Sequence, residues 1–306
     1  MIRLPLSIVI VNWNTKDLLL DCLASVFATV KELSFEVILV DNASTDGSVV
    51  AVRCQYPLVR VIQNDRNLGF AAANNRAFSV MRGHYALLLN TDTILTDGAV
   101  ASLFCHMEEN KQVAMACGQL LNQDSSRQNS IANFPSFLGL LVNESLLRRI
   151  FPHRFPGKNR EYHQPFEVES CIGACLMARK EAMDQVGLLD ESYFFFFEET
   201  DWAWRMRQAG WKSVFVPQAR IYHLQGQSAG NNVKSRIMFY RSRYIFLRRW
   251  HSRGFHLFVI IVSARLFVDL ILNAVASVAT LGLNKRFRGK AATYARLAWW
   301  HICGCP

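Results

Sequence analysis

The sequence predicts an α/β protein with a doubly wound, mostly parallel sheet, followed by a helical extension that associates with a membrane. Two observations predict the sheet: short apolar runs alternate with segments of helical periodicity over the first ninety or so residues, and polar residues follow the apolar runs. A third observation, the positive charge concentrated after Lys234, predicts the extension. With 306 residues, of which 51% are hydrophobic, the chain can bury a substantial core, which excludes a disordered protein.

Four apolar runs predict the strands of the parallel part of the sheet. Each run is short and bounded by turn residues, which is typical of strands buried on both faces. The runs are Leu6–Val11, Phe35–Val40, Leu58–Gln63 and Tyr85–Leu89. The same sheet is expected to bind its ligand at the carboxyl ends of these strands.

Helices are expected between and after these strands. Apolar residues recur at helical spacing from Leu18 to Val30, so one face of that helix should pack on the sheet. A short helix toward Tyr56, a helix from Ala71 to Met81 and a helix from Ala99 to Lys111 complete the alternation. Strand and helix therefore alternate as they do in doubly wound folds.

The pattern loosens after the last of these helices. A polar, proline-containing stretch from Asn122 to Ser170 predicts a variable excursion with one helix around Phe137 to Ile150. The small-residue run Cys171–Ala178 predicts a strand. The run Lys212–Val216 predicts another strand, which Pro217 should halt.

Polar residues stand where the predicted strands end, so they should converge on one crevice. Asp92 could hold a metal or a charged ligand there, although a lone Asp after a strand is more often a turn or cap residue. Asp41 could accept hydrogen bonds from a pyrimidine or a ribose, and Gly69 would permit the close approach of a pyrophosphate. The other polar residues at this edge are Asn12, Asn14, Asn67 and Asn90.

A second cluster of candidate residues follows five consecutive aromatic residues, Tyr193–Phe197. There Glu198, Glu199 and Asp201 stand at the start of a helix. Acidic residues at a helix N-terminus are stabilised by the helix dipole, so a structural role is open beside the role of a general base tuned by aromatic surroundings. His223 is likewise either a packing residue or, if it shares a crevice with Asp92, a ligand.

Seven segments together resemble the family 2 glycosyltransferases of the GT-A fold, and among these the rhamnosyltransferase-like group. They occur in the family's order between about residue 5 and about residue 230. The segments are Ser7–Asn14, Val40–Gly47, Asn67–Ala71, Leu87–Asp92, Gly173–Met177, Phe197–Asp201 and Gln208–Trp211. In contrast, neither G-x-G-x-x-G nor G-x-x-x-x-G-K-[ST] occurs, which removes the main support for a dinucleotide-binding or P-loop protein.

The resemblance implies an inverting transfer of a sugar from a nucleotide diphosphate donor to an acceptor hydroxyl. The favoured donor is dTDP-rhamnose, and the expected acceptor is a glycan or a polyprenyl-linked glycan in cell-surface polysaccharide synthesis. Two domains follow from it: residues 1–233 would form the GT-A domain, with a nucleotide-binding half over 1–110 and an acceptor and catalytic half over 111–233. Residues 234–306 would form the helical tail.

The resemblance also implies roles for single residues. Asp41 would contact the nucleobase, and Asp92 would bind a divalent cation, Mg²⁺ or Mn²⁺, that bridges the diphosphate. His223 would assist at the metal, and Glu199 would be the base, with Glu198 and Asp201 as alternatives. The expected substrate-binding residues are Asn12, Asn14, Asp41, Asn67, Gly69, Asn90 and Trp202.

The chain departs from the family pattern at the expected metal ligand and at the expected base. The segment Asn90–Asp92 offers one firm carboxylate, so its metal affinity should be low. Glu199 stands where the family usually has an aspartate, so its carboxylate is one methylene farther from the backbone.

The C-terminal tail is both basic and apolar. From Lys234 onward it carries 13 Lys and Arg residues and one acidic residue, Asp269, a formal charge of +12, which leaves −2 of the net +10 for the first 233 residues. The apolar run His256–Leu283 is long enough to span a bilayer, but positive residues flank both its ends, which disfavours a single crossing. Arg265 and Asp269, four residues apart, predict a paired helical face.

These features predict helices that lie in an anionic membrane surface, with a single transmembrane helix as the alternative. No nucleic acid partner is expected. Eight cysteines without a disulfide framework predict reduced thiols, and Leu6–Val11 is too short for a signal sequence. The expected location is therefore the cytoplasm, at the inner face of the cell membrane.

Two other functions compete with sugar transfer. A nucleotidyltransferase would need a glycine-rich basic loop after the first strand, where Asn12–Thr15 stands instead. A non-catalytic membrane scaffold that binds a nucleotide sugar would leave Glu198 and Glu199 without a role.

Overall fold

The computed structural model describes residues 4–142, 144–158, 160–224, 233–281 and 283–304. They form two compact units. Unit 1 comprises 1–134 and 153–228, and unit 2 comprises 135–152 and 229–306. The chain therefore divides close to the predicted boundary at 233, but the segment 135–152, expected in the first domain, belongs to unit 2.

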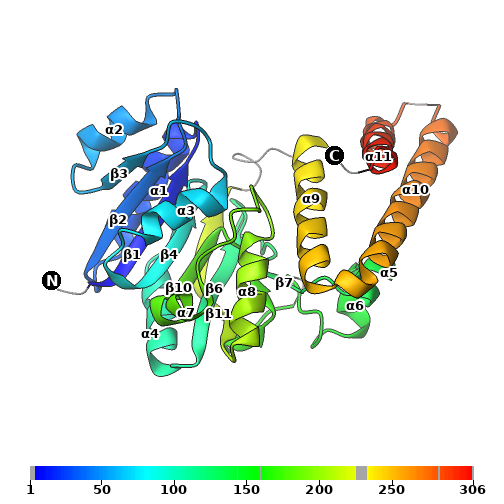
Figure 1. The fold of residues 1–306 in the computed structure, drawn as a ribbon. Helices are drawn as coiled ribbons and strands as arrows, with labels where there is room; N and C mark the ends of the chain where they lie inside the picture. Colours follow the sequence, from blue (N-terminus) through cyan, green and yellow to red (C-terminus); the bar gives the residue numbers. More distant parts are fainter. Residues whose placement is uncertain (1–3, 143, 159, 225–232, 282, 305–306) are drawn as a thin grey trace. The chain divides into compact units, whose positions relative to one another are not determined.

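Unit 1 is built on a nine-stranded mixed sheet (Figure 1). Along the sheet the order is β3-β2-β1-β4-β10-β6-β11-β5, and β8 pairs with β11. The strands are β1 (Leu4–Asn12), β2 (Phe35–Asp41), β3 (Arg60–Gln63), β4 (Gly83–Asn90), β5 (Thr93–Leu95), β6 (Val113–Leu121), β8 (Phe166–Val168), β10 (Cys175–Arg179) and β11 (Lys212–His223). A separate two-stranded sheet joins β7 (Ile131–Ala132) to β9 (Ser170–Cys171).

The pairing directions bring several strand ends to one edge. β1 runs parallel to β2 and β4, and β2 runs parallel to β3. β10 is antiparallel to both β4 and β6, and β11 is parallel to β6, so β11 runs in the same direction as β1. The carboxyl ends of β1, β2, β4 and β11 therefore lie at the same edge of the sheet, as the sequence predicts for the ligand-binding edge.

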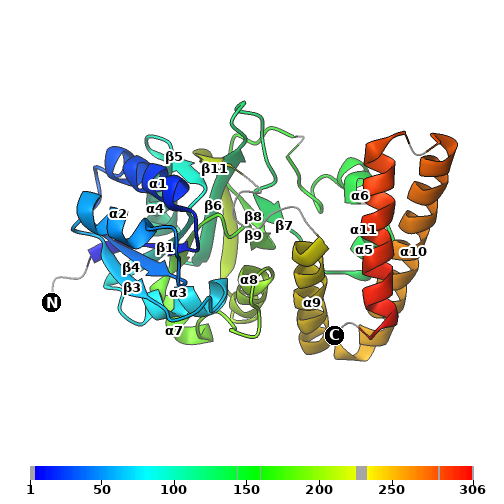
Figure 2. The same ribbon diagram turned by 90° about the horizontal axis from the view of Figure 1, so that it is seen from above.

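Helices cover both faces of this sheet (Figure 2). They are α1 (Lys16–Thr29), α2 (Ser48–Gln55), α3 (Phe70–Phe78), α4 (Ala99–Glu109), α7 (Lys180–Val186) and α8 (Glu198–Gln208). On one face, Leu19 and Leu23 of α1 and Leu103 of α4 pack with alternate residues of β1 such as Ile8. α3, α7 and α8 lie on the other face. Both faces are apolar, which explains the uninterrupted apolar runs of the central strands.

β6 and β11 are the strands of the large sheet whose differences from the sequence-based expectation bear on the site. β6 was not predicted, because its small and polar residues, among them Gly118 and Gln119, hide a strand in which every residue is buried. β11 does not stop at Pro217 as predicted but continues to His223. Its register against β6 shifts between Val216 and Arg220, so Pro217 lies in an irregular stretch where no amide has to donate to the ladder.

The predicted strand Cys171–Ala178 is also interrupted. Cys171 ends β9 of the small sheet, and Cys175 begins β10 of the large one. Residues 172–174 connect the two strands, so Gly173 lies in a connection at the ligand-binding edge and not inside a strand.

Unit 2 is helical. Its elements are α5 (Phe137–Leu141), α6 (Glu144–Ile150), α9 (Val233–Trp250), the 3₁₀ helix η1 (Ser252–Gly254), α10 (Phe255–Ala279) and α11 (Lys285–Ile302). The single helix predicted around 137–150 is two helices, because Val142 has an extended backbone that ends α5. Phe258, Val262 and Leu266 of α10 are buried in the core of this unit, which also contains Leu140 of α5.

The predicted pairing of Arg265 with Asp269 on α10 is wrong. The Arg265 guanidinium instead donates to the Leu140 carbonyl of α5, at 3.0 Å. Within the described residues no ion pair joins Arg265 to Asp269. Arg265 therefore ties α10 to α5 and does not form a charged helical face.

Candidate active site

The first part of the site lies at the carboxyl ends of β4 and β11. Asp92, two residues beyond β4, is only 2% exposed. Its Oδ1 atom lies 3.5 Å from His223 Nε2, at the end of β11. No hydrogen-bond donor among the described residues contacts this buried Oδ1. The structure thus brings Asp92 and His223 together, as the sequence predicts.

The backbone holds this pair in place. The Leu224 amide donates to the Asp92 carbonyl at 2.8 Å, and the ladder between β11 and β5 pairs His223 with Thr93. The continuation of β11 past Pro217 is therefore what carries His223 to Asp92. Sequence reasoning missed a third member of the group, Gln128, whose Oε1 lies 2.9 Å from His223 Nδ1. It stands in the polar excursion, where no motif marks it.

The residues at this position fit a divalent cation. A buried carboxylate oxygen without a donor, next to an imidazole nitrogen, is a donor set suited to Mn²⁺, and to Mg²⁺ through the carboxylate. In the described part of the chain, no group of three or more His, Cys, Asp or Glu side chains could hold a metal. Asp92 and His223 would therefore supply only part of a coordination shell, which leaves positions for oxygen atoms of a ligand.

The second part of the site is the start of α8, where the sequence predicts acidic residues at a helix N-terminus. Phe196 and Phe197, just before the helix, both have φ of 71°, in the left-handed region that residues with a Cβ rarely adopt. After this turn Glu199 is half-buried, whereas Glu198 is 4% exposed and its Oε2 has no hydrogen-bond partner.

The surroundings of both carboxylates disfavour their charged forms. Burial raises the pKa of Glu199 to about 7, although the backbone amides of Glu199 and Thr200 donate to it and act in the opposite direction. Burial also raises the pKa of Glu198 well above its usual value, and the negative charge of Glu199 raises it further. Glu199 is the less buried of the two carboxylates, so it is the better placed to meet an acceptor hydroxyl.

The connection between β9 and β10 links the two parts of the site. A Cβ atom added at Gly173 would lie 3.9 Å from Glu199 Cγ and 3.9 Å from the Phe70 ring. The carbonyl of the next residue, Ala174, accepts a hydrogen bond of 2.9 Å from the Asn90 amide at the end of β4. Glu199 therefore lies against the same short connection that contacts the strand end leading to Asp92. Asn90 itself is only partly buried.

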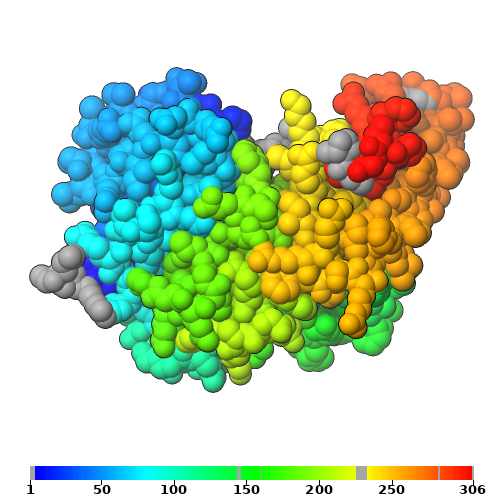
Figure 3. Space-filling model, viewed as in Figure 1, coloured from blue at the N-terminus to red at the C-terminus, as the bar shows by residue number. Residues whose placement is uncertain are grey.

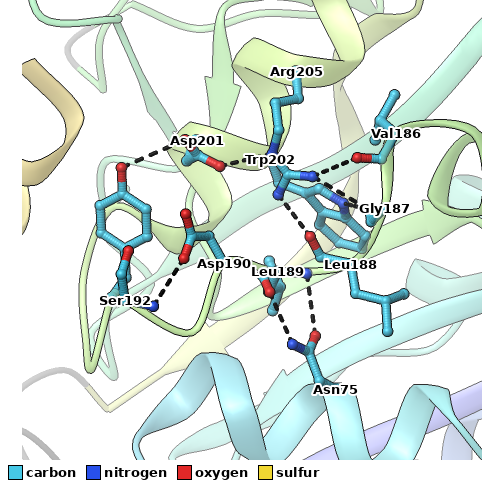
Figure 4. A network of polar contacts seen from close by, with 11 residues as sticks. Asn75, Val186, Gly187, Leu188, Leu189, Asp190, Ser192, Asp201, Trp202 and Arg205 are labelled. Atoms are coloured by element: carbon cyan, nitrogen blue, oxygen red, sulfur yellow. Dashed lines mark hydrogen bonds and ion pairs between the residues drawn. The ribbon is translucent and has the colours of Figure 1, made fainter. Parts of the chain in front are cut away.

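Asp201 and Trp202 have structural roles (Figure 4). Asp201 is fully buried and pairs with Arg205 Nε at 2.8 Å. Arg205 also donates to the carbonyls of Val186 and Leu188. Trp202 is fully buried as well and donates to the Gly187 carbonyl at 2.9 Å. The expectations that Asp201 is an alternative base and that Trp202 binds substrate are therefore corrected: both side chains are used to hold the loop after α7.

Asn12 and Asp41 are also used inside the protein. Asn12 is fully buried, and its Nδ2 lies 2.8, 3.0 and 2.8 Å from Asp41 Oδ1, Ser44 Oγ and Ser48 Oγ, which share its two protons. Its Oδ1 accepts a hydrogen bond from Thr15. Because the side chain is fully buried among these partners, it is not presented to a substrate, which corrects the expected role of Asn12. Asp41 is 1% exposed, and its other oxygen accepts from the Ser44 amide.

Asn14, Asn67 and Gly69 shape two loops at this edge. Asn14 is exposed and accepts from the Thr45 amide at 2.7 Å, and Asn67 accepts from the Gly69 amide at 2.9 Å. Gly69 has φ of 85°, and a Cβ there would lie 2.4 Å from the Phe194 carbonyl oxygen. A close approach occurs at Gly69, as predicted, but the approaching group is the aromatic loop and not a pyrophosphate. The Phe70 amide donates to the same carbonyl, at 2.9 Å.

The family model of glycosyl transferase family 2 matches residues 7–187, more than half of the chain. The chain belongs to this family. The enzyme is 32% identical over 238 residues to the N-acetylglucosaminyl-diphospho-decaprenol L-rhamnosyltransferase of Mycobacterium tuberculosis, covering 72% of this chain and 77% of the relative. It is 24% identical over 255 residues to the dTDP-rhamnosyl transferase RfbF of Shigella flexneri, covering 79% and 80% of the two chains.

The fold of this glycosyltransferase is that of GT-A enzymes, as predicted. A solved structure of the mannosyltransferase PcManGT from Pyrobaculum calidifontis, in complex with GDP-Man and Mn²⁺, superimposes with a TM-score of 0.59 at 16% identity. The match covers 98% of this chain and 88% of that one. The prediction of a glycosyltransferase is confirmed, and the alternatives of a nucleotidyltransferase and of a scaffold without activity lose their basis.

Proposed function

We propose that this glycosyltransferase transfers rhamnose, with inversion, from dTDP-rhamnose to a hydroxyl of a glycan or polyprenyl-linked glycan during cell-surface polysaccharide synthesis. The names of two relatives support the sugar: both are rhamnosyl transferases, one of them named for dTDP-rhamnose. The name of the mycobacterial relative supports a lipid-linked acceptor. The observation that carries the chemistry is the half-buried Glu199, whose pKa of about 7 suits a general base.

In the proposed reaction Glu199 accepts the proton of the acceptor hydroxyl. The hydroxyl oxygen forms a bond to the anomeric carbon of the donor sugar, while the bond from that carbon to the diphosphate oxygen breaks. The nucleoside diphosphate leaves with the electron pair of the broken bond. A single displacement of this kind inverts the configuration and needs one base on the side opposite the leaving group.

Asp92 and His223 would hold the divalent cation at the diphosphate end of the site. A bound Mg²⁺ or Mn²⁺ would offset the charge that develops on the departing diphosphate. The unpartnered Asp92 oxygen and the 3.5 Å between it and His223 Nε2 support this assignment. Asn90, Asn14 and Asn67 remain the candidates for donor contacts at the same edge, whereas Asp41 would reach a nucleobase only if its turn shifts, because it is 1% exposed.

A transfer assay with a panel of nucleotide sugars tests the donor. We expect rhamnose transfer from dTDP-rhamnose and little transfer from GDP-mannose or UDP-N-acetylglucosamine. In parallel, dTDP should raise the melting temperature, since a ligand at about 100 times its dissociation constant adds about 2.7 kcal/mol to the free energy of unfolding. Efficient transfer from another donor, together with stabilisation by its nucleotide and not by dTDP, would disprove the rhamnose assignment.

We also propose that unit 2 binds an anionic membrane surface at the cytoplasmic face. α10 lies at the surface of this unit (Figure 3). Large apolar side chains are exposed along its length and form what we call the apolar stripe: Leu257, Ile260, Phe267, Val268, Ile271, Leu272, Val275 and Val278. A continuous exposed apolar surface of this kind marks an interaction site, and the +12 formal charge from Lys234 onward suits anionic lipid.

The packing of unit 2 favours a helix that lies in the membrane surface. In the described part of the chain, one helical segment, Ser252–Ala279, is long and apolar enough to cross a bilayer, with a mean hydropathy of 2.2. However, α11 packs along α10 and exposes basic residues such as Arg288, Lys290 and Arg296. A spanning α10 would draw these charges into the hydrocarbon, which is costly. A helix lying in the surface leaves them at the lipid headgroups.

Liposome flotation tests the membrane proposal. The double variant Ile271→Glu/Val275→Glu places two charges in the apolar stripe, where both side chains are exposed and no packing is lost. We expect its binding to anionic vesicles to fall at least tenfold. The control Val50→Glu/Leu58→Glu changes two exposed apolar residues of unit 1 and should bind as the wild type does. Equal binding of both double variants would place the membrane contact elsewhere or remove it.

A further inference from the structure

The orientation of the His223 ring has a specific cause in the structure. Its Nε2 faces Asp92 Oδ1 at 3.5 Å, beyond the usual length of a hydrogen bond, and its Nδ1 lies 2.9 Å from Gln128 Oε1. If Nε2 carries the proton, the ring is a hydrogen-bond donor toward Asp92; if only Nδ1 carries it, Nε2 presents a lone pair to Asp92. The contacts of Gln128 settle that question.

Gln128 is oriented by groups that can only accept hydrogen bonds. Its Nε2 lies 2.6 Å from the His223 backbone carbonyl and 2.7 Å from Asn122 Oδ1. A carbonyl oxygen has no proton to donate, so the Gln128 atom facing it must be the amide nitrogen. The other atom of the amide, facing His223 Nδ1, is then the oxygen and can only accept. His223 Nδ1 must therefore carry the proton.

In the neutral ring this assignment leaves His223 Nε2 with a free lone pair directed at Asp92. The Asp92 Oδ1 atom that it faces is buried and receives no hydrogen bond from the described residues. Two electron-rich atoms facing each other in a buried place repel unless a positive charge lies between them. The arrangement is that of two ligands of one cation and not that of a hydrogen-bonded pair.

Gln128 is well placed to hold the ring rigidly. Gln128 is 5% exposed, and its backbone amide donates to the Leu120 carbonyl at 2.8 Å. Because its Nε2 and Oε1 contact the backbone carbonyl and the ring of the same histidine, they fix both the position and the tautomer of His223. Partners of this kind, which bond the far nitrogen of a ligand histidine, typically change metal affinity about 10- to 100-fold when removed.

The geometry points to Gln128 as a positioning residue for the cation site: it keeps His223 as the Nδ1–H tautomer, so that Nε2 and Asp92 Oδ1 present two lone pairs to a divalent cation. This inference rests on the proposed metal role of Asp92 and His223. It adds the residue that prepares the site before any cation or donor arrives.

Nitrogen NMR of the metal-free protein tests the tautomer directly. With ¹⁵N-labelled histidine at mildly alkaline pH, and with His223→Gln to assign the signals, we expect a protonated Nδ1 and an unprotonated Nε2 for His223. In Gln128→Met, which keeps the length of the side chain but has no acceptor, this preference should be lost. The control Gln119→Met changes a buried glutamine of β6 that lacks the contact with His223 but donates to the Gln128 backbone carbonyl at 3.0 Å. It therefore reports a general disturbance of this region, and the tautomer should be kept. A wild-type ring protonated at Nε2, or at both nitrogens, overturns the inference even if Gln128→Met does not fold.

Binding of Mn²⁺, measured by electron paramagnetic resonance with and without dTDP, separates this inference from the proposed function. We expect Gln128→Met to weaken Mn²⁺ binding about 10- to 100-fold and Gln128→Glu, which restores an acceptor for Nδ1–H, to recover part of the loss. If Asp92→Asn and His223→Gln weaken binding but Gln128→Met does not, Gln128 is not a positioning residue and the metal site stands. If Gln128→Met changes the tautomer while Asp92→Asn leaves Mn²⁺ binding unchanged, the positioning of His223 stands and the metal role fails.

Discussion

Two pairs of polar residues at the ends of the parallel strands differ in how their atoms are used. Asn12 and Asp41, at the ends of β1 and β2, bond to each other and to the loop between β2 and α2. Asp92 and His223, beyond β4 and at the end of β11, face each other with an oxygen that no described donor contacts. Both pairs are almost completely buried. Because buried polar atoms are nearly always hydrogen-bonded, the unpartnered Asp92 oxygen is a candidate position for a ligand, whereas Asn12 and Asp41 hold the loop after β2.

The same contrast separates the acidic residues of α8. Asp201 is bonded to Arg205, whereas Glu198 has an oxygen without a partner and Glu199 is partly open to solvent. The start of α8 thus carries one structural carboxylate, Asp201, and two candidate reactive carboxylates, Glu198 and Glu199.

The largest effect is expected from Asp92→Asn. The change removes the charge that would hold the cation, and a metal that stabilises transition-state charge contributes several kcal/mol, so transfer should fall at least about 1,000-fold. Because the Oδ1 atom has no partner among the described residues, the free energy of unfolding should change little. Transfer assays and urea unfolding measure the two quantities. Activity that survives both this change and EDTA would refute the metal role.

The second-largest effect is expected from Glu199→Gln. Turnover should fall about 10²- to 10⁴-fold, since general-base help is commonly of this size, while dTDP binding should be unchanged. Glu198→Gln is the matched control: its carboxylate is 4% exposed, so a smaller loss is expected. Glu199→Asp, which restores the residue usual in the family, should keep part of the activity. A dead Glu198→Gln beside an active Glu199→Gln would shift the base by one residue.

Asp201→Asn should act on stability and not on chemistry. Removing one partner of a buried ion pair typically costs about 3 kcal/mol, and here it leaves Arg205, itself only 13% exposed, without its carboxylate. The midpoint of urea unfolding should fall accordingly, while the variant remains active at low temperature. A normal midpoint combined with lost turnover would return Asp201 to the catalytic residues.

The smallest effect concerns pH. Since Glu199 must be unprotonated to accept a proton, kcat/KM should rise with pH and level off above about 7, the pKa to which burial raises this group. The same raised pKa makes a contribution to stability that is full below the usual value of 4.5 and is lost as pH rises through about 7. The pH profiles of transfer and of thermal unfolding measure both. If kcat/KM instead levels off just above pH 4.5, the usual pKa of a glutamate, Glu199 is not the base.

Much of the fold was predictable because it depends on local patterns. Apolar runs predict β1, β2 and β4 to within a few residues, and the carboxylates after an aromatic turn predict the start of α8. Asp92 stands out in the sequence since parallel strands carry their ligands just beyond their carboxyl ends. Strand period, helix period and turn chemistry act over a few residues, so a single sequence contains them in full.

The tertiary structure alone decided which of the marked residues are free to act. The extension of β11 past Pro217 depends on a register shift against β6, a strand that the sequence conceals. Gln128 meets His223 across 95 positions of the chain, and the bonds that occupy Asn12 come from residues up to 36 positions away. Whether a buried oxygen has a donor is settled by chain segments that meet only after folding. The sequence therefore determined where reactive groups stand, and long-range packing determined which of them remain open.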